Sequence, residues 1–264
     1  MKVAIFDADV LPYIVCHNKK DSNKVKTLND CIISLNSFIN NIMKATNATH
    51  YIMALTCGGS FRNKYNPEYK SNRKYVKIDY LEEVKNYLVT EYKAVFHYGE
   101  LEADDICNIC IKYSSNDVRT VPIAFIVSQD KDLLMLEGTH FNPRKMEWVT
   151  TSKQQALDYF WTTMITGYTI DGVKGIEGYG KVRAKKILEE DRFKIIDNIT
   201  HVSPHHSIVM MNYMDKYGEY EGIKNFAKNY VSLKILDKYD GFKVPEPIKF
   251  EFKNVFEEKD NKGQ

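Results

Sequence analysis

Two apolar runs in this sequence lead directly into acidic residues. Val3–Phe6 runs into Asp7, and Ile123–Val127 is followed within three residues by Asp130. Short apolar runs of this length, rich in β-branched and aromatic residues, predict buried β-strands. In an open α/β sheet the carboxyl ends of the strands lie along one edge, and ligands bind there. The two runs therefore predict a sheet with acidic side chains gathered at one edge.

Seven acidic residues in four short segments are candidates for this edge. They are Asp7, Glu102, Asp104, Asp105, Asp130, Asp132 and Asp171. Like charges packed together are unfavourable unless a cation neutralises them. Mg²⁺ and Mn²⁺ are hard cations that prefer oxygen ligands. Acids also favour the N-terminus of a helix, so capping is the simpler alternative for a single segment. Their joint occurrence in this order indicates metal-dependent chemistry on phosphates.

The first 150 residues alternate between strand-like and helix-like patterns. The expected helices are Leu28–Met43, Tyr80–Tyr92, Glu102–Tyr113 and Lys131–Leu136, and the further expected strands are Tyr51–Leu55 and Ala94–Tyr98. This alternation predicts an α/β fold with a mainly parallel sheet and helices on both faces.

The pattern changes after Trp148. Ser152–Thr166 and Lys181–Glu189 have the spacing of helices, and the turn-rich segment 167–180 lies between them. We expect a core over residues 1–150, a helical region over 151–256 and a disordered tail over 257–264, because the tail is charged and lacks apolar anchors.

Composition argues against several classes of protein. The net charge of +2 does not by itself indicate nucleic-acid binding. No apolar run approaches the ~20 residues that cross a bilayer, and the N-terminus lacks a signal-peptide pattern. The five cysteines lack the spacing of a disulfide framework, so we expect a reducing cytoplasm, no membrane and no disulfide-linked partner. Cys107 and Cys110 lack a second pair at zinc spacing and fit burial on a helix.

Basic residues gather in two places outside the acidic segments. The stretch around 60–77 is basic and aromatic with little apolar periodicity, which predicts an exposed arch. The second cluster, residues 181–186, follows Gly175, Gly178 and Gly180. Glycines before a helix let backbone N–H groups approach a phosphate. A solvated charge run and an ordinary helix–turn–helix connection are the simpler alternatives. The basic helix favours a helix-hairpin-helix that grips a nucleic-acid backbone.

Together these motifs resemble those of the 5′ nuclease superfamily, which includes flap endonucleases, the 5′-nuclease domain of bacterial DNA polymerase I and bacteriophage 5′–3′ exonucleases. The resemblance rests on Asp7 after a strand and, in order, on FRNKYNPEYKSNRK, ELEADD, SQDKDLL and TIDGVKGIEGYGKVRAKKIL. It extends to about residue 190. It implies a PIN-like α/β core, a helix-hairpin-helix appendage (H3TH-type) around residues 165–190, and metal-dependent hydrolysis of phosphodiester bonds near 5′ ends.

The resemblance also implies roles for individual residues. The first of two metal ions, Mg²⁺ or Mn²⁺, would be held by Asp7, Glu102, Asp104 and Asp105. Asp130 and Asp132 would lie between the two sites, and Asp171 would serve the second. Lys70 and Arg73 would contact the scissile phosphate, and Tyr69 would stack on a terminal base. The residues assigned to nucleic acid are Arg62, Tyr69, Lys70, Arg73, Gly175, Gly178, Gly180, Lys181, Arg183 and Lys185. The hairpin would hold K⁺ through carbonyl groups.

Two positions depart from the superfamily pattern. Cys57 stands nearest to the place where many relatives have an acid after the second strand, and Tyr168 replaces an aspartate. We therefore expect the second metal ion to bind weakly. The expected partner is DNA with a 5′ end, a flap or a nick, and RNA–DNA hybrid is a further substrate. We also expect the protein to be a monomer that is encoded by a phage and acts in replication, repair or DNA degradation.

Two other functions stay open. Asp7 and Asp9 resemble the DxD motif of haloacid-dehalogenase-like phosphohydrolases, in which one aspartate attacks phosphorus and the other acts as an acid. The acidic helix, the basic arch and the glycine hairpin argue against this function, since a small-molecule phosphatase needs none of them. The second alternative is a nuclease fold that binds branched DNA without cutting it. Tyr168 and Cys57 are its only support.

Overall fold

The computed structural model describes residues 1–17, 26–73, 77–116, 123–190 and 204–253. The expected disordered tail, 257–264, lies outside these residues. Within them, a six-stranded sheet has the order β5-β4-β3-β1-β2-β8. The strands are β1 (Lys2–Asp7), β2 (His50–Ala54), β3 (Ile123–Val127), β4 (Gly138–Asn142), β5 (Glu147–Thr151) and β8 (Ile248–Lys249). The four inner strands pair in parallel, and β5 and β8 pair antiparallel at the edges. The predicted α/β fold with a mainly parallel sheet is confirmed.

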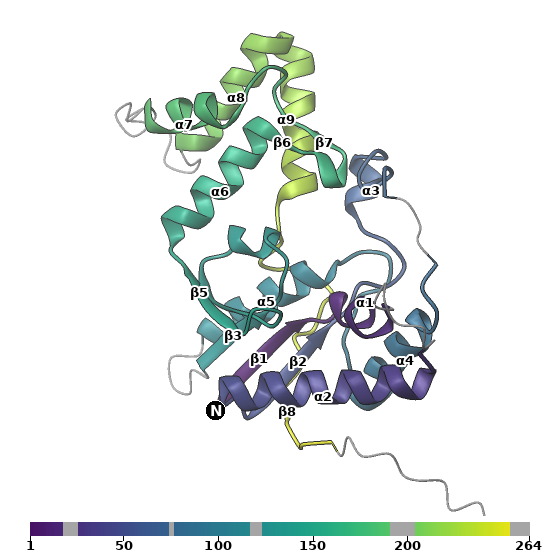
Figure 1. Cartoon of the computed structure of the whole chain (residues 1–264). Coiled ribbons are helices and arrows are strands. Elements are labelled where there is room, and N and C mark those ends of the chain that lie inside the picture. Colours follow the sequence, from purple (N-terminus) through teal and green to yellow (C-terminus); the bar gives the residue numbers. More distant parts are fainter. Residues whose placement is uncertain (18–25, 74–76, 117–122, 191–203, 254–264) are drawn as a thin grey trace, which may run out of the picture.

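Helices cover both faces of this sheet, and a second group of helices stands above its carboxyl edge (Figure 1). The sheet is accompanied by α1 (Val10–Cys16), α2 (Leu28–Thr46), α3 (Arg62–Tyr65), α4 (Leu81–Glu91), α5 (Ala103–Asn116) and the 3₁₀-helix η1 (Asp132–Met135). The second group contains α6 (Lys153–Thr166), β6 (Gly167–Tyr168), η2 (Thr169–Asp171), β7 (Val173–Lys174), α7 (Lys181–Glu190), α8 (Pro204–Tyr217) and α9 (Glu219–Leu233). Among the described residues, none of the helices combines the length and hydrophobicity that a membrane crossing requires.

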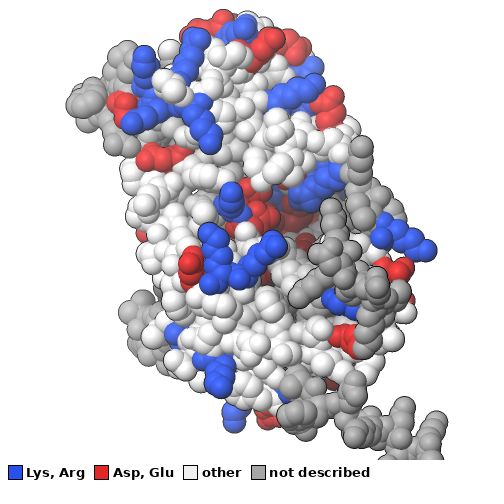
Figure 2. Space-filling model, in the orientation of Figure 1, with Lys and Arg blue, Asp and Glu red and all other residues white. Residues whose placement is uncertain are grey.

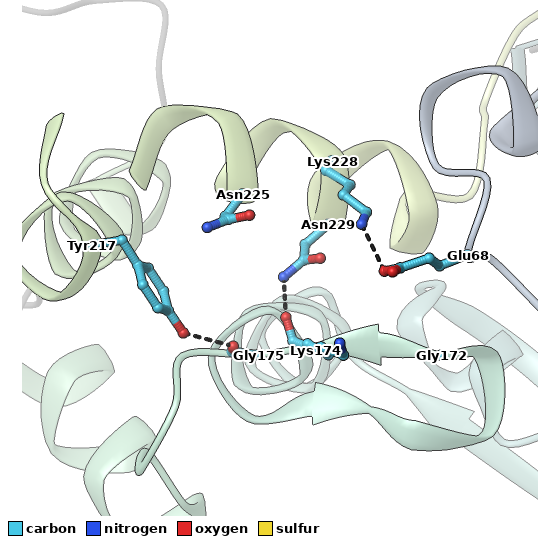
Figure 3. Close-up of a pocket in the computed structure, with 8 residues that line it drawn as sticks. All are labelled: Glu68, Gly172, Lys174, Gly175, Tyr217, Asn225, Lys228 and Asn229. Carbon is cyan, nitrogen blue, oxygen red and sulfur yellow. Dashed lines mark hydrogen bonds and ion pairs between the residues drawn. The ribbon is translucent and has the colours of Figure 1, made fainter. Parts of the chain in front are cut away.

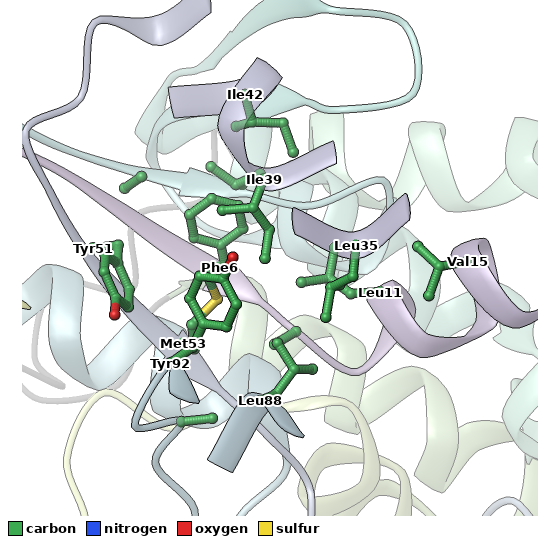
Figure 4. Close-up of a cluster of buried hydrophobic side chains, with 14 of the residues drawn as sticks. Phe6, Leu11, Val15, Leu35, Ile39, Ile42, Tyr51, Met53, Leu88 and Tyr92 are labelled. Atoms are coloured by element: carbon green, nitrogen blue, oxygen red, sulfur yellow. The ribbon is translucent and has the colours of Figure 1, made fainter. Parts of the chain in front are cut away.

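Strand β1 is buried on both faces because its alternate side chains enter different cores. Phe6 packs with α1, α2 and α4 in the cluster of Figure 4. Ile5 packs with α5 on the other face. Successive side chains of a strand point to opposite faces, so a strand covered on both sides has to be apolar throughout. This requirement explains the continuous apolar run at the N-terminus.

Side-chain caps set the start of two long helices. The Thr27 hydroxyl accepts a hydrogen bond from the Asp30 N–H group, and the Asp30 carboxylate accepts one from the Thr27 N–H group. Ser152 and Gln155 make the same reciprocal pair at the start of α6. Caps of this kind contribute about 1 kcal/mol each to helix stability. The second one starts α6 immediately after β5 and so directs the chain away from the sheet.

Several expected elements differ from those observed. The expected strand Ala94–Tyr98 is reduced to one parallel bridge between Val95 and Ala54. The expected helix Lys131–Leu136 is the shorter 3₁₀-helix η1. The expected helical region 151–256 also returns to the sheet, because β8 pairs with β2 and Ile235 lies in the core beside α5. The return of the chain to the sheet depends on partners far away in the sequence.

Candidate active site

Acidic side chains from three separate segments line one cavity at the carboxyl edge of the sheet. The cavity has a volume of about 450 Å³. Its walls include Asp7 at the end of β1, Asp104 in the first turn of α5, and Asp130 and Asp132 after β3. Figure 2 shows carboxylates in a central hollow with Lys and Arg side chains around it. The expected convergence of these acids is present, and their catalytic roles stay predictions.

Ser128, which the sequence analysis did not single out, connects two of the acidic segments. Its hydroxyl donates to Asp7 Oδ2 at 2.8 Å and accepts the N–H group of Asp130 at 2.9 Å. Asp130 Oδ1 in turn accepts the N–H group of Asp132 at 2.9 Å. The parallel pairing of β1 with β3 brings these groups together. The sequence does place a polar residue, Ser128, between the strand Ile123–Val127 and Asp130, and this position could have identified it as part of the site.

The charged forms of three cavity carboxylates are disfavoured. Burial, followed by repulsion from Asp9, raises the pKa of Asp7 from 3.8 to about 7. Burial, followed by repulsion from Asp130, raises the pKa of Asp132 to about 7. Burial is also the main reason why the pKa of Asp104 lies well above its ordinary value. A bound cation would reverse this balance, because it favours the ionised form of a carboxylate.

The donor set fits a hard divalent cation. The Oδ1 atom of Asp132 is buried and has no hydrogen-bond partner. Oxygen ligands from carboxylates are those that Mg²⁺ and Mn²⁺ prefer. Within the described residues, however, no group of three or more His, Cys, Asp or Glu side chains is already arranged to hold a metal ion. Glu102 lines the cavity and Asp171 lies outside its lining, and both carboxylates are paired with basic side chains.

Glu102 lines the cavity and is held by the segment 61–73. Its carboxylate accepts hydrogen bonds from Tyr69 Oη at 2.9 Å, Lys70 Nζ at 2.7 Å and Arg62 Nη1 at 3.3 Å. Burial is the largest influence and acts to raise the pKa of Glu102. The charges of Lys70 and Arg62, with the hydrogen bonds from Lys70 and Tyr69, outweigh it and lower that pKa. Glu102 thus stays ionised without a metal ion.

Asp105 does not line the cavity. Its carboxylate was expected to bind a metal ion, but in the structure it pairs with Arg62. The Arg62 guanidinium donates to both of its carboxylate oxygens, at 2.6 and 2.7 Å, and the N–H group of Leu236 donates at 2.9 Å. Asp105 is 0% exposed and Arg62 is 1% exposed. This burial corrects the expectation that Arg62 contacts nucleic acid. The pair joins the segment 61–73 and α5 to the chain that follows α9.

The expected arch is therefore only partly exposed. Tyr69 is buried with its hydroxyl on Glu102, which corrects the expectation that it stacks on a terminal base. Lys70 and Arg73 do line the cavity. Lys70 has a positive φ of 57°, and its N–H group donates to the carbonyl of Asp171 at 2.9 Å. The structure thus presents two basic side chains to the acids and buries Arg62, Asn66 and Tyr69 of the same segment.

Asp171 lies beside the cavity lining and is paired with Arg73. Its Oδ1 atom is 2.5 Å from Arg73 Nη2. Tyr168 stands where the superfamily pattern has an aspartate, and burial, followed by the charge of Asp132, raises the pKa of its phenol. A phenol hydroxyl is a poorer ligand for a hard cation than a carboxylate. The side of the cavity near η2 therefore has fewer available carboxylates than the side near β1.

The glycine-rich segment forms a tight hairpin between α6 and α7, in the predicted order helix, hairpin, helix. Gly167 pairs with Lys174 across β6 and β7. A side-chain Cβ atom on Gly175 would lie 2.3 Å from Gly167 N and 2.3 Å from Ile165 O, so only glycine fits there. Lys181, Arg183 and Lys185 are exposed on α7. Their positions are compatible with the expected contact to a nucleic-acid backbone.

A cavity of about 240 Å³ separates this hairpin from α9 (Figure 3). Asn229 donates to the carbonyl of Lys174, and the Tyr217 hydroxyl donates to the carbonyl of Gly175 at 3.4 Å. Lys228 pairs with Glu68 at 2.9 Å, which connects α9 to the segment 61–73. The hairpin is therefore held in place by side chains from α8 and α9.

Gly175→Ala is expected to disrupt the hairpin. The added methyl group would overlap backbone atoms of α6 and β6, so the two strands have to separate. We expect a clearly lower melting temperature and weaker binding to duplex DNA. Gly180→Ala is the control for stability, because a Cβ atom at Gly180 meets no atom within 4 Å. Equal melting temperatures for the two variants, measured by circular dichroism, would contradict this account of the hairpin.

Comparison with known proteins relates this geometry to a family. The model of the family described as 5′-3′ exonuclease, N-terminal resolvase-like domain, matches residues 2–160. No curated protein matches the chain in a sequence search. Similar solved structures include a bacteriophage T5 protein co-crystallised with metal ions, which is 18% identical, with 88% of this chain and 90% of that chain covered and a TM-score of 0.63.

Two further bacteriophage T5 structures are similar over most of the chain. One is a 5′-exonuclease with divalent metal ions (zinc) bound, at 18% identity and a TM-score of 0.61, with 88% of this chain and 91% of that chain covered. The other is a flap endonuclease in a pseudo-enzyme–product complex with DNA and metal ions. It is 18% identical, with 86% of this chain and 93% of that chain covered and a TM-score of 0.60. At these identities the likeness concerns the fold.

Proposed function

This chain belongs to the 5′-3′ exonuclease family and is a 5′ nuclease, and we propose that it hydrolyses DNA near 5′ ends with the help of Mg²⁺ or Mn²⁺. One observation carries this proposal. Asp7, Asp104 and Asp130 arrive from three segments in one cavity, and Lys70 and Arg73 line it too. We propose action both as a 5′–3′ exonuclease and as a structure-specific flap endonuclease, in replication, repair or DNA degradation.

The side chains of the cavity divide into two groups. When bound, divalent cations would supply a hydroxide at neutral pH and stabilise the attacking and leaving oxygens. Asp7, Asp104, Asp130 and Asp132 are the residues that would hold them. Glu102 and Asp171 would join once their basic partners move to the substrate. No side-chain nucleophile is needed for this reaction.

Lys70 and Arg73 have the position to neutralise charge on a reacting phosphate. Without substrate, each of them neutralises an acid, Glu102 and Asp171 respectively. A phosphodiester is an alternative anion for the same two cations, and charge-assisted bonds to it would offset the charge that develops during hydrolysis. Exchange of these partners would free Glu102 and Asp171 for metal ions. This exchange is part of the proposal.

The group of helices above the sheet would hold the substrate. We propose that the hairpin and the exposed bases of α7 bind the backbone of duplex DNA or of RNA–DNA hybrid, with K⁺ on the hairpin carbonyl groups. We propose two domains that meet near residue 150, a nuclease core and a helical region. Residues 235–249 belong to the core, because they pack against its sheet. We also propose a monomer in the cytoplasm of a phage-infected cell.

Calorimetric titration of the free protein with Mn²⁺ is expected to show one tight site and one weak site. The reason is that Tyr168 occupies the place of an aspartate and Asp171 is paired with Arg73. Tyr168→Asp should tighten the weak site by roughly 10–100-fold, the range over which groups around a metal site act. Tyr168→Phe, the matched control, should leave it weak. Two equally tight sites in the unaltered protein would refute this expectation.

A digestion assay on 5′-labelled duplex and flap DNA, with and without Mg²⁺ or Mn²⁺, tests the proposed function. Release of short labelled products only with metal present is the expected result. Turnover of an aryl phosphate in preference to DNA would instead favour the phosphohydrolase that uses Asp7 and Asp9. Tight DNA binding without cleavage at any metal concentration would favour the binding protein.

A further inference from the structure

Asp9 occupies the N-cap position of α1 but does not cap the helix. Aspartate at this position commonly accepts a hydrogen bond from a backbone N–H group of the first turn. Asp9 has helical backbone angles, and its side chain makes no cap hydrogen bond. Its carboxylate turns to Thr56 after β2. Oδ1 accepts the Thr56 N–H group at 2.8 Å, and Oδ2 accepts the Thr56 hydroxyl at 2.5 Å.

The Thr56 hydroxyl makes a second hydrogen bond, to the start of α5. It accepts the N–H group of Ala103, the first residue of α5, at 2.9 Å. The N–H groups of a first helical turn have no partner within the helix, so an outside acceptor stabilises the start of the helix. Because the hydroxyl donates its only hydrogen to Asp9, its lone pair is left to accept from Ala103. Asp104 is the next residue along.

This chain of hydrogen bonds connects the segment that carries Asp7 with the segment that carries Asp104, through the end of β2. The parallel register of β1 and β2 places Asp7 opposite Ala54, and the same offset places Asp9 opposite Thr56. The N–H group of Ala8 also bonds to the carbonyl of Ala54 at 2.9 Å. Asp9 and Thr56 both line the cavity. The contact therefore lies between Asp7 on β1 and Asp104 on α5.

Asp9 also brings a carboxylate to a place where this sequence lacks one. The second strand ends in Thr56 and Cys57 rather than in an acid. The carboxylate of Asp9 reaches this strand end from β1 and bonds to its backbone. It therefore contributes negative charge there without being part of β2.

We propose that Asp9 and Thr56 are positioning residues for the nuclease reaction. They hold the first turn of α5 against the end of β1 and thereby set the separation between Asp7 and Asp104. The catalytic consequence rests on the proposed function, and the geometric consequence does not. Neither residue has to touch the substrate for this role. Loss of the hydroxyl would leave the Ala103 N–H group and one oxygen of Asp9 without their partners.

Thr56→Val tests the proposal, because valine has nearly the same shape and lacks the hydroxyl. We expect Mn²⁺ affinity, measured by calorimetry with the metal alone, and kcat on a 5′-labelled flap each to fall by about 10–100-fold, as for other groups that orient metal ligands. KM should change little, since DNA contacts are untouched. Thr56→Ser restores the hydroxyl and should recover most of both values. Asp9→Asn should resemble Thr56→Val.

Thr46→Val is the matched control. Thr46 is a buried threonine at the end of α2, and its hydroxyl bonds to the carbonyl of Ile42. It should keep native Mn²⁺ affinity and kcat. Melting temperatures of all variants identify any that fail to fold. Native Mn²⁺ affinity and kcat in Thr56→Val, or equal losses in Thr56→Ser and Thr56→Val, would overturn the proposal. An unaltered protein that does not cut DNA would overturn the proposed function, while a loss of affinity in Thr56→Val would still uphold the positioning role.

Discussion

Asp104→Asn and Asp130→Asn are each expected to abolish cleavage while the protein stays folded. Both carboxylates line the cavity where metal ions are proposed to bind. Removing a charged ligand should cost more than the 10–100-fold that the loss of an outer partner costs, so we expect kcat to fall by more than about 100-fold. Burial already raises the pKa of Asp104, so its neutral replacement should not lower the melting temperature. Single-turnover assays with saturating enzyme measure the effect.

Binding and control measurements separate a chemical defect from a structural one. Affinity for 5′-flap DNA, measured by fluorescence anisotropy without divalent metal, should be at least native in both variants, since a neutral amide repels the phosphates less than a carboxylate does. Asp215→Asn is the matched control, because Asp215 is exposed on α8. It should cut at the native rate. Retained turnover in either cavity variant would contradict the assignment of that residue.

Arg62→Met is expected to produce the largest loss of stability in the core. Arg62 is the buried partner of Asp105 and, at 3.3 Å, of Glu102. Removing one member of a buried ion pair leaves an uncompensated charge and typically costs about 3–5 kcal/mol. Methionine fills similar volume, so the loss would arise from the charge and not from a cavity. Urea unfolding followed by circular dichroism measures it.

Two further variants identify the cause. Adding Asp105→Asn to Arg62→Met should restore part of the stability, because the buried carboxylate is then neutral. Lys64→Met, in the same segment, removes the exposed partner of Glu100 and should change the unfolding midpoint little. A midpoint for Arg62→Met equal to that of Lys64→Met would show that the buried pair does not stabilise the fold.

Local pattern was enough to predict three of the four inner strands, β1, β2 and β3, and the acids that follow β1 and β3, but it did not reveal β4. Val3–Phe6 is apolar throughout because it is covered on both faces, and in Ile123–Val127 the last three residues are buried in the same way, so no distant information is needed to recognise these strands. The carboxyl ends of neighbouring parallel strands necessarily share an edge, so Asp7 and Asp130 could be placed together. The glycine segment was recognisable from its closely spaced glycines before a basic helix, whereas the close approach at Gly175, which admits no side chain, is visible only in the structure.

The environment of charged residues could not be predicted in the same way. Arg62 lies in a basic stretch that resembles an exposed arch, yet it is buried on Asp105 and on the carbonyl of Lys234, at 2.7 Å. Nothing near Arg62 in the sequence indicates a partner 172 residues away. The same applies to β8, whose two residues pair with β2 only after the chain returns from α9.

The sequence by itself determined the apolar strands β1, β2 and β3 and which strand ends carry acids, because these follow from periodicity and from the direction of the chain. Only the tertiary structure decided which acids remain available in the cavity. Glu102, Asp104 and Asp105 belong to one four-residue motif, but contacts with Arg62, Tyr69 and Lys70 engage Glu102 and Asp105. The physical reason is that the state of a carboxylate depends on its burial and on the charges that surround it, and these come from segments far away in the chain.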